Sequence, residues 1–291
     1  MTYQFSKMQG AGNDYIYFDC MDQMLPEPEK AALRFSDRHF GVGGDGIVLI
    51  CPSLLADARM RMFNLDGSEG RMCGNAIRCV AKYLYERRHI HKSPMKIETL
   101  SGIKELYLEI KEGTVASVTV NMGKAELRPR EIPVLLAGER AVDTLLWLDG
   151  KEYRVTCVSM GNPHMVLFGE DPDTLSLSEI GPRFERHPVF PQGVNVEFVQ
   201  VLDAHHLKMR VWERGSGETL ACGTGACAAV TAAVLGGHCQ SDTPVEVALP
   251  GGVLTIRYTD TAVWMTGPAA FVFDGQVEWI EETGEEEQRC S

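Results

Sequence analysis

Two cysteine residues stand where a thiol could take part in chemistry. Cys73 opens the segment CGNAIRCVAKYL and Cys222 opens the segment CGTGACAAVTAA. Each follows a polar turn and precedes small and apolar residues at helical spacing, which predicts that each thiol lies in the first turn of a helix. Because a helix N-terminus stabilises a thiolate, we expect the pKa of each thiol to fall toward neutral pH. The unpaired backbone amides beside the thiols would suit a carboxylate, and they belong to Gly74, Asn75, Gly223 and Thr224.

A matched pair of thiols suits the inversion of a carbon centre. Such a reaction removes a proton from one face of the carbon and delivers a proton to the other face, so it needs two acid/base groups of similar pKa. The α-proton of an amino acid is a very weak acid, and the carbanion must be stabilised through the adjacent carboxylate. Two converging helix N-termini would provide that stabilisation, so we expect no cofactor.

A single offset relates the two halves of the chain. The cysteines are 149 residues apart (222 − 73 = 149), and the same offset aligns further motifs without a gap. The aligned pairs are Gly12-Asn13 with Gly161-Asn162, Gly44 with Gly193, Met60-Arg61 with Met209-Arg210, and Glu69 with Glu218. The sequence therefore predicts a duplicated domain.

The elements predicted for the two halves follow the same order. Each half should hold a strand, a helix, two strands, the buried helix that begins at the cysteine, and three closing strands. The predicted ranges are 15–18, 29–37, 47–51, 59–63, 96–100, 104–110 and 117–121 in the first half, and 165–168, 173–184, 196–201, 206–212, 245–249, 253–258 and 262–265 in the second. We expect an α+β fold with domains at 1–127 and 128–273, separated by the linker-like segment 128–133. A last strand, 276–280, has no place in the second unit, and residues 274–291 are expected to join the first.

Composition excludes several classes of protein. The chain has 291 residues, 44% hydrophobic residues and a formal net charge of −12, which predicts a soluble globular protein that does not bind nucleic acid or anionic membranes. It contains no apolar run of membrane-spanning length and no signal-peptide pattern, so we expect a cytoplasmic protein. Nine cysteines without a regular framework indicate reduced thiols. Because the sequence contains no Cys-x-x-Cys pair, we predict no structural metal site.

Four segments resemble the diaminopimelate epimerases. They are GAGNDY, FNLDGSEGRMCGNAIRC, SMGNPH and ERGSGETLACGTGACAA, and the resemblance extends from about Phe5 to Phe273. The last segment separates this family from the proline racemases and the phenazine-synthesis isomerases of similar fold. The resemblance implies two domains related by a pseudo-twofold axis, each a mostly antiparallel β-sheet or barrel around a central helix. It also implies a cofactor-independent interconversion of LL- and meso-diaminopimelate in lysine and peptidoglycan precursor biosynthesis.

The resemblance also implies roles for individual residues. Cys73 and Cys222 would be the two acid/base catalysts, and His164 and Glu213 would tune and support them. The amides of Gly74, Asn75, Gly223 and Thr224 would receive the reacting carboxylate. The remaining substrate-binding residues would be Asn13, Asn64, Asn162, Asn195 and Arg214, with Glu213 also in contact. A homodimer is implied as well. The chain departs from the family pattern at Gly46, where a polar residue is common, and at Phe273, where some members have a tyrosine linked to dimer packing.

Two other functions fit the same residues. The first is a racemase of another amino acid, such as proline or histidine, on the same fold. We favour it less, because Arg214 and the set of asparagines would bind a second charged end that such a substrate lacks. The second is a catalytically inert protein that binds an anion at the two helix N-termini, but such a protein needs no matched pair of thiols.

Overall fold

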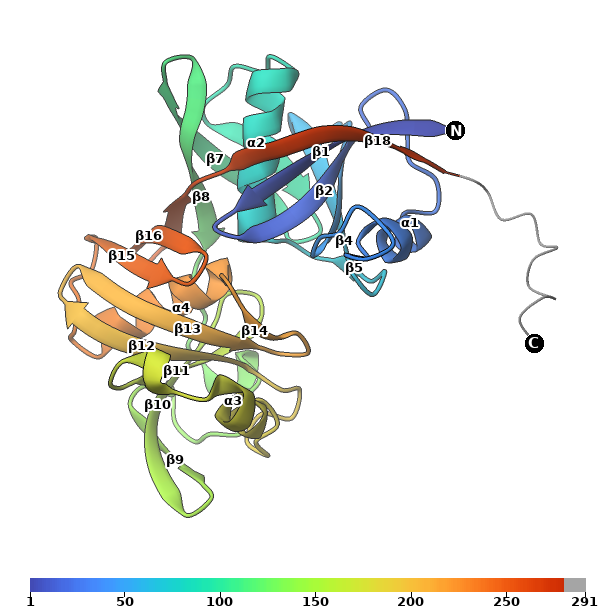
Figure 1. The fold of residues 1–291 in the computed structure, drawn as a ribbon. Helices are drawn as coiled ribbons and strands as arrows, with labels where there is room; N and C mark the ends of the chain where they lie inside the picture. Colours follow the sequence, from blue (N-terminus) through green and yellow to red (C-terminus); the bar gives the residue numbers. More distant parts are fainter. Residues whose placement is uncertain (280–291) are drawn as a thin grey trace, which may run out of the picture.

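The computed structural model describes residues 1–279 and contains two halves, stacked one above the other in Figure 1. The first half comprises β1 (Thr2–Gly10), β2 (Asn13–Asp19), α1 (Pro28–Phe35), β3 (Gly46–Cys51), β4 (Ala58–Asn64), β5 (Glu69–Gly70), α2 (Gly74–Arg87), β6 (Met95–Thr99), β7 (Gly102–Lys111) and β8 (Thr114–Gly123). The acidic run 281–287 and the end of the predicted strand 276–280 lie outside the described residues.

The second half follows the same order with one added strand at its start. It comprises the 3₁₀ turn η1 (Pro129–Glu131), β9 (Thr144–Leu148), β10 (Lys151–Ser159), β11 (Pro163–Phe168), the 3₁₀ turn η2 (Pro172–Thr174), α3 (Leu177–Glu185), β12 (Asn195–Asp203), β13 (His206–Glu213), β14 (Gly217–Thr219), α4 (Gly223–Leu235), β15 (Pro244–Leu249), β16 (Gly252–Tyr258) and β17 (Val263–Gly267). The last strand of the described residues is β18 (Ala270–Glu278).

Strand register repeats with the offset found in the sequence. In the β3–β4 pair Val48 lies opposite Met62, and in the β12–β13 pair Glu197 lies opposite Val211. Both differences equal the cysteine spacing (197 − 48 = 149; 211 − 62 = 149). Because one slipped residue would turn every side chain to the other face of the sheet, the shared register confirms the duplicated α+β fold.

The same ion pair occurs in both halves, beside the turn that leads to each cysteine. Arg61 Nε and Nη2 donate to the two carboxylate oxygens of Glu69 at 2.7 and 3.0 Å. Arg210 makes the same two bonds to Glu218 at 2.8 and 3.0 Å. This bidentate pair joins the strand before each cysteine turn to the short strand within it. Each turn is therefore held in the same way ahead of its helix.

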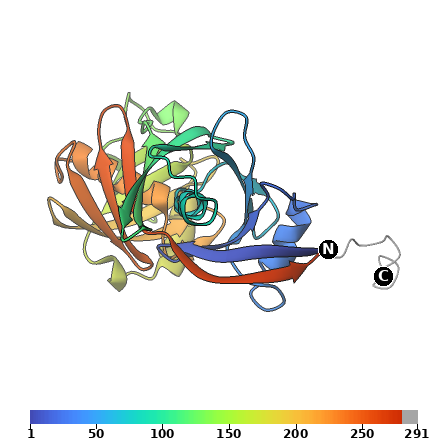
Figure 2. The same cartoon turned by 90° about the horizontal axis from the view of Figure 1, so that it is seen from above.

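The two long helices α2 and α4 are buried inside their own halves. Figure 2 views α2 almost end-on, with the strands of the first half around it. Small residues allow α4 to be covered on every side, since Ala226, Ala228, Ala229 and Ala233 have no exposed surface. This packing holds the N-terminus of each helix at a fixed place between the two halves.

Two connections join the halves, and the first is a strand pair that the sequence did not predict. Strands β8 and β17, one from each half, pair antiparallel, and the hydroxyls of Thr119 and Thr266 lie 2.7 Å apart. The chain then crosses back, since β18 pairs with β1 and places Gly275 opposite Phe5. Figure 1 shows β18 returning along the first half. No helix within residues 1–279 is long and apolar enough to cross a membrane.

One local expectation was inaccurate. The helix expected at 173–184 begins later, as α3 at Leu177, because Pro172 opens a separate 3₁₀ turn whose amide at Asp173 is capped by the Asp171 carboxylate. In the linker-like segment 128–133, Ile132 packs into the core of the second half, while Arg128, Arg130 and Glu131 are exposed.

Candidate active site

Each predicted thiol caps a helix. Cys73 and Cys222 adopt extended backbone conformations as the N-cap residues of α2 and α4. Cys73 Sγ accepts from the Ala76 amide at 3.5 Å, and Cys222 Sγ accepts from the Gly225 amide at 3.4 Å. The same cap in both halves places both thiols at helix N-termini, as the sequence indicated.

The expected fall in the pKa of the thiols is wrong. Burial raises the pKa of the Cys73 thiol, and burial raises that of Cys222 well above its usual range. The amides of the first helical turn do lower both values, but the loss of hydration of the charged thiolate outweighs them. The sequence indicates the helix N-terminus, but it does not indicate the residues that bury the thiol and remove its hydration.

One carboxylate acts on both thiols. The negative charge of Glu213 contributes to the raised pKa of Cys73 and also to that of Cys222. Glu213 Oε1 accepts from the Thr219 hydroxyl at 2.5 Å, and burial raises the pKa of the Glu213 carboxyl itself. The charge of one carboxylate therefore influences the ionisation of both thiols.

The first turns of the two helices meet at Met265. A side chain added at Gly74 would lie 2.5 Å from Met265 Cε, and one added at Gly223 would lie 2.9 Å from Met265 Sδ. Asn75 Nδ2, in the first turn of α2, donates to the Ala221 carbonyl at 3.5 Å, just ahead of α4. Glycine at both positions therefore allows the two helix N-termini to approach each other.

A chain of polar contacts leads to Cys222. His164 Nε2 lies 3.0 Å from Asn162 Oδ1, and Asn162 Nδ2 donates to Thr224 Oγ1 at 3.4 Å. Thr224 Oγ1 in turn lies 3.5 Å from Cys222 Sγ. Three residues that the sequence nominated separately are thus joined to the second thiol.

Cys73 has a different set of partners. Its Sγ donates to Asn13 Oδ1 at 3.3 Å, and Asn13 Nδ2 donates to Asp45 Oδ2 at 2.6 Å. Asp45 also pairs with Arg38, with Nη2 and Oδ1 3.0 Å apart. Sequence reasoning missed Asp45, although its place in the GGDG motif was a usable signal.

Three nominated residues have no recorded bond to either thiol within the described chain. Asn64 bonds Ser68 in its own turn. Asn195 is buried, and its amide bonds only backbone groups: Nδ2 donates to the Pro163 carbonyl at 2.8 Å, and Oδ1 accepts from the Arg214 amide at 3.0 Å. The Arg214 side chain is exposed and donates to the Gln192 carbonyl at 2.9 Å. Asn195 thus positions the backbone that carries Arg214.

Known proteins match nearly the whole chain. A model of the family "Diaminopimelate epimerase" matches residues 5–128 and 156–272. The diaminopimelate epimerase of Acetivibrio thermocellus is 52% identical over 277 residues, covering 94% of this chain and 98% of the relative. That of Methanococcus maripaludis strain S2 is 51% identical over 277 residues, with 94% and 99% covered.

The chain belongs to the diaminopimelate epimerase family.

More distant solved structures share its fold. A probable proline racemase from Agrobacterium radiobacter superposes with a TM-score of 0.72 at 14% identity, covering 97% of this chain and 94% of that chain. A hydroxyproline epimerase from Agrobacterium vitis gives a TM-score of 0.69 at 16% identity, covering 95% and 92%. At these identities the likeness describes the fold alone, and it confirms the expected duplicated architecture of this epimerase-family chain.

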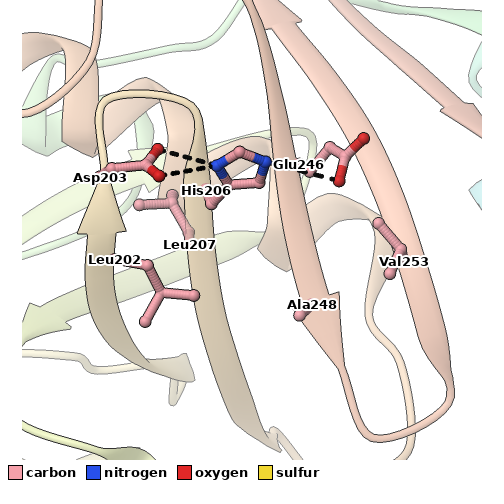
Figure 3. Close-up of a pocket in the computed structure, with 7 residues that line it drawn as sticks. All are labelled: Leu202, Asp203, His206, Leu207, Glu246, Ala248 and Val253. Atoms are coloured by element: carbon pink, nitrogen blue, oxygen red, sulfur yellow. Dashed lines mark hydrogen bonds and ion pairs between the residues drawn. The ribbon is translucent and has the colours of Figure 1, made fainter.

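A separate pocket lies on the surface of the second half (Figure 3). In it, His206 Nδ1 lies 2.8 Å from an Asp203 oxygen, and its Nε2 lies 3.8 Å from a Glu246 oxygen. The other lining residues are Leu202, Leu207, Ala248 and Val253. Neither thiol lines this pocket, so it is distinct from the cysteine site.

Proposed function

We propose that this epimerase-family protein interconverts LL- and meso-diaminopimelate, with Cys73 and Cys222 as the two acid/base catalysts. The observation that carries the proposal is the pairing of the thiols: each caps the equivalent helix of a duplicated half, and Glu213 acts on both. One thiolate removes the α-proton while the opposite thiol delivers a proton to the other face. In the reverse direction the two exchange roles.

The helix N-termini supply the stabilisation of the carbanion. Amides in the first turns of α2 and α4 hold the reacting carboxylate, where negative charge accumulates as the α-proton leaves. The amides come from Gly74, Asn75, Gly223 and Thr224. The close contact of both first turns with Met265 brings these donors to one place.

The raised pKa values assign a role to the substrate. Burial favours the neutral form of both thiols. The α-ammonium group of a bound amino acid brings a positive charge next to them, which favours formation of one thiolate. His164 and Glu213 support the thiols, and Asn13, Asn64, Asn162 and Arg214 hold the rest of the substrate, with Asn195 fixing the Arg214 backbone.

The same proposal includes a homodimer that acts in the cytoplasm. Val272 and Phe273 on β18 are 56% and 48% exposed, and Phe273 packs edge-on to Phe5, 5.9 Å between ring centroids. Burial of such apolar surface would favour association of two copies. Light scattering on the full chain should give twice the chain mass, and a monomer at micromolar concentration would contradict the dimer.

A substrate panel with two cysteine variants tests the proposed function. The wild-type protein should epimerise LL-diaminopimelate and leave proline and histidine unchanged. Cys73→Ala and Cys222→Ala should each abolish epimerisation while the protein remains folded, and Cys239→Ala should retain it. Cys239 is a buried cysteine outside both helix caps, which makes it a matched control. Racemisation of proline alone, or full turnover by either catalytic-site variant, would refute the proposal.

A further inference from the structure

Glu197 is a fully buried carboxylate that the assignments above do not use. It lies on β12, and both its side chain and that of His164 have no exposed surface. Its Oε1 lies 2.7 Å from His164 Nδ1, while Oε2 has no hydrogen-bond partner among residues 1–279. Keeping an ionisable side chain buried in this way is costly, so a role beyond packing is expected.

The carboxylate lies directly beneath the second thiol. A side chain added at Gly225 would meet Glu197 Oε1 at 2.7 Å and Cys222 Sγ at 3.3 Å. Glu197 is therefore packed against the first turn of α4, which Cys222 caps. It is also the far end of the contact chain through His164, Asn162 and Thr224 to Cys222.

The duplicated half lacks this arrangement. With the offset of 149, Glu197 corresponds to Val48 and His164 corresponds to Tyr15 (197 − 149 = 48; 164 − 149 = 15). Glu197 and Val48 sit at the same strand register. The fold therefore accepts an apolar residue at this position, and the carboxylate is not needed to build the strand pair.

We propose that Glu197 is a positioning residue for the second thiol: its carboxylate accepts a hydrogen bond from His164 Nδ1 and so fixes the ring that, through Asn162 and Thr224, orients the Cys222 thiol. An ionised carboxylate only accepts, so Nδ1–H donates to Glu197, and because Asn162 Oδ1 is also an acceptor, Nε2–H donates to it. The expected effect on kcat rests on the proposed function, whereas the expected effect on the ionisation of Cys222 does not.

The charge of Glu197 also acts on the Cys222 thiol. Glu197 and Glu213 are both among the leading causes of the raised pKa of Cys222, whereas Glu213 is the one carboxylate among the leading causes for Cys73. The groups that face Glu197 are Cys157 from β10, His164 from β11, Glu213 from β13 and Cys222 from α4. Removal of the Glu197 charge should therefore shift the ionisation of Cys222 to lower pH and leave that of Cys73 in place.

Two variants test the inference. Glu197→Gln keeps the shape and removes the charge, and Glu197→Val installs the residue that the first half carries at the same register. We expect kcat to fall roughly 10- to 100-fold, more for valine than for glutamine, because a displaced acid/base group loses its alignment. KM should stay within about twofold, since no substrate-binding group has changed. Iodoacetamide alkylation, located by peptide mass spectrometry, should move to lower pH at Cys222 alone.

The control and the contrary results are defined by the same assays. Glu246→Gln, an exposed carboxylate of the same half, should change neither kcat nor the alkylation profiles. The inference is overturned if a folded Glu197→Gln protein keeps the wild-type kcat, or if its Cys222 alkylation profile does not move relative to that of Cys73. If the Glu197→Val protein does not fold, the Glu197→Gln protein alone decides the test. If the wild-type protein does not act on diaminopimelate, the alkylation shift still tests Glu197, and only the proposed function fails.

Discussion

Arg78 holds Asn75 in the first turn of α2, with Arg78 Nη1 3.0 Å from Asn75 Oδ1. The guanidinium is fully buried and also donates to the carbonyls of Gly74 at 3.2 Å and Pro268 at 3.1 Å. Pro268 lies in the connection between β17 and β18, where the chain passes from the second half to the first. One arginine thus joins a nominated carboxylate-binding turn to the crossing between the halves.

Replacement of Arg78 should destabilise the protein. Arg78→Leu removes the buried side-chain donors to Asn75 Oδ1 and to the Gly74 and Pro268 carbonyls, and we expect the free energy of unfolding to fall by roughly 2 to 4 kcal/mol. Urea unfolding followed by circular dichroism measures the change. Arg257→Leu removes an exposed pair with Asp242 and should cost less than about 1 kcal/mol. Equal losses for the two variants would contradict the role of Arg78.

The close approach at Met265 should be visible in a pair of glycine variants. Gly74→Ala places a methyl group within 2.5 Å of Met265 Cε, so the first turn of α2 or the methionine must shift. We expect kcat/KM to fall about 10-fold or more. Met265→Ala in the same chain should restore part of the loss, which a double-mutant cycle measures. Gly169→Ala, at a glycine without a positive φ and with no atom within 4 Å of the added group, is a control for expression and assay.

The Thr224 hydroxyl is predicted to matter for turnover. Thr224→Val keeps the shape and removes the link between Asn162 and Cys222, so we expect kcat to fall about 10-fold. Thr231→Val in the same helix removes a hydroxyl that bonds only the Cys227 carbonyl, and it should leave kcat unchanged. Steady-state kinetics on both variants decides, and an active Thr224→Val protein would remove the hydroxyl from the site.

Buried thiols should make stability depend on alkaline pH. Burial raises the pKa of Cys157 to about 12 and that of Cys79 to about 11. A thiol in the unfolded chain ionises near pH 8.5, so the folded state holds its proton more tightly. The stabilising effect is full below that pH and is lost as pH rises toward the folded values. Each thiol should contribute up to about 1.4 kcal/mol per pH unit in this window.

Urea midpoints at pH 8 and pH 10.5 measure this loss. The midpoint should fall between the two values in the wild-type protein, and by less in Cys157→Ala, which removes one buried thiol. The comparison uses each protein at pH 8 as its own reference, because the alanine variant also loses packing. A drop that is the same with and without Cys157 would assign the alkaline loss to other groups.

The duplication could be predicted from the sequence because the repeated motifs are all separated by the same 149 residues. The cysteine turns, the Arg–Glu pairs and the Gly-Asn pairs all keep one offset, and strand register preserves that offset in space. The thiol environment could not be read in the same way, since desolvation depends on residues such as Met265 that carry no motif. Glu197 had a usable signal: the repeat places it opposite an apolar Val48.

Deuterium incorporation during the first turnovers tests the two-thiol mechanism most directly. When LL-diaminopimelate is epimerised in heavy water, the two-thiol mechanism predicts deuterium at the inverted α-carbon of the meso product and almost none in the LL-diaminopimelate recovered at early times. The reason is that the proton leaves to one thiol and the deuteron arrives from the other. Mass spectrometry of both isomers gives the result. Equal early labelling of recovered substrate and product would show that one group serves both faces, and the central claim would be wrong.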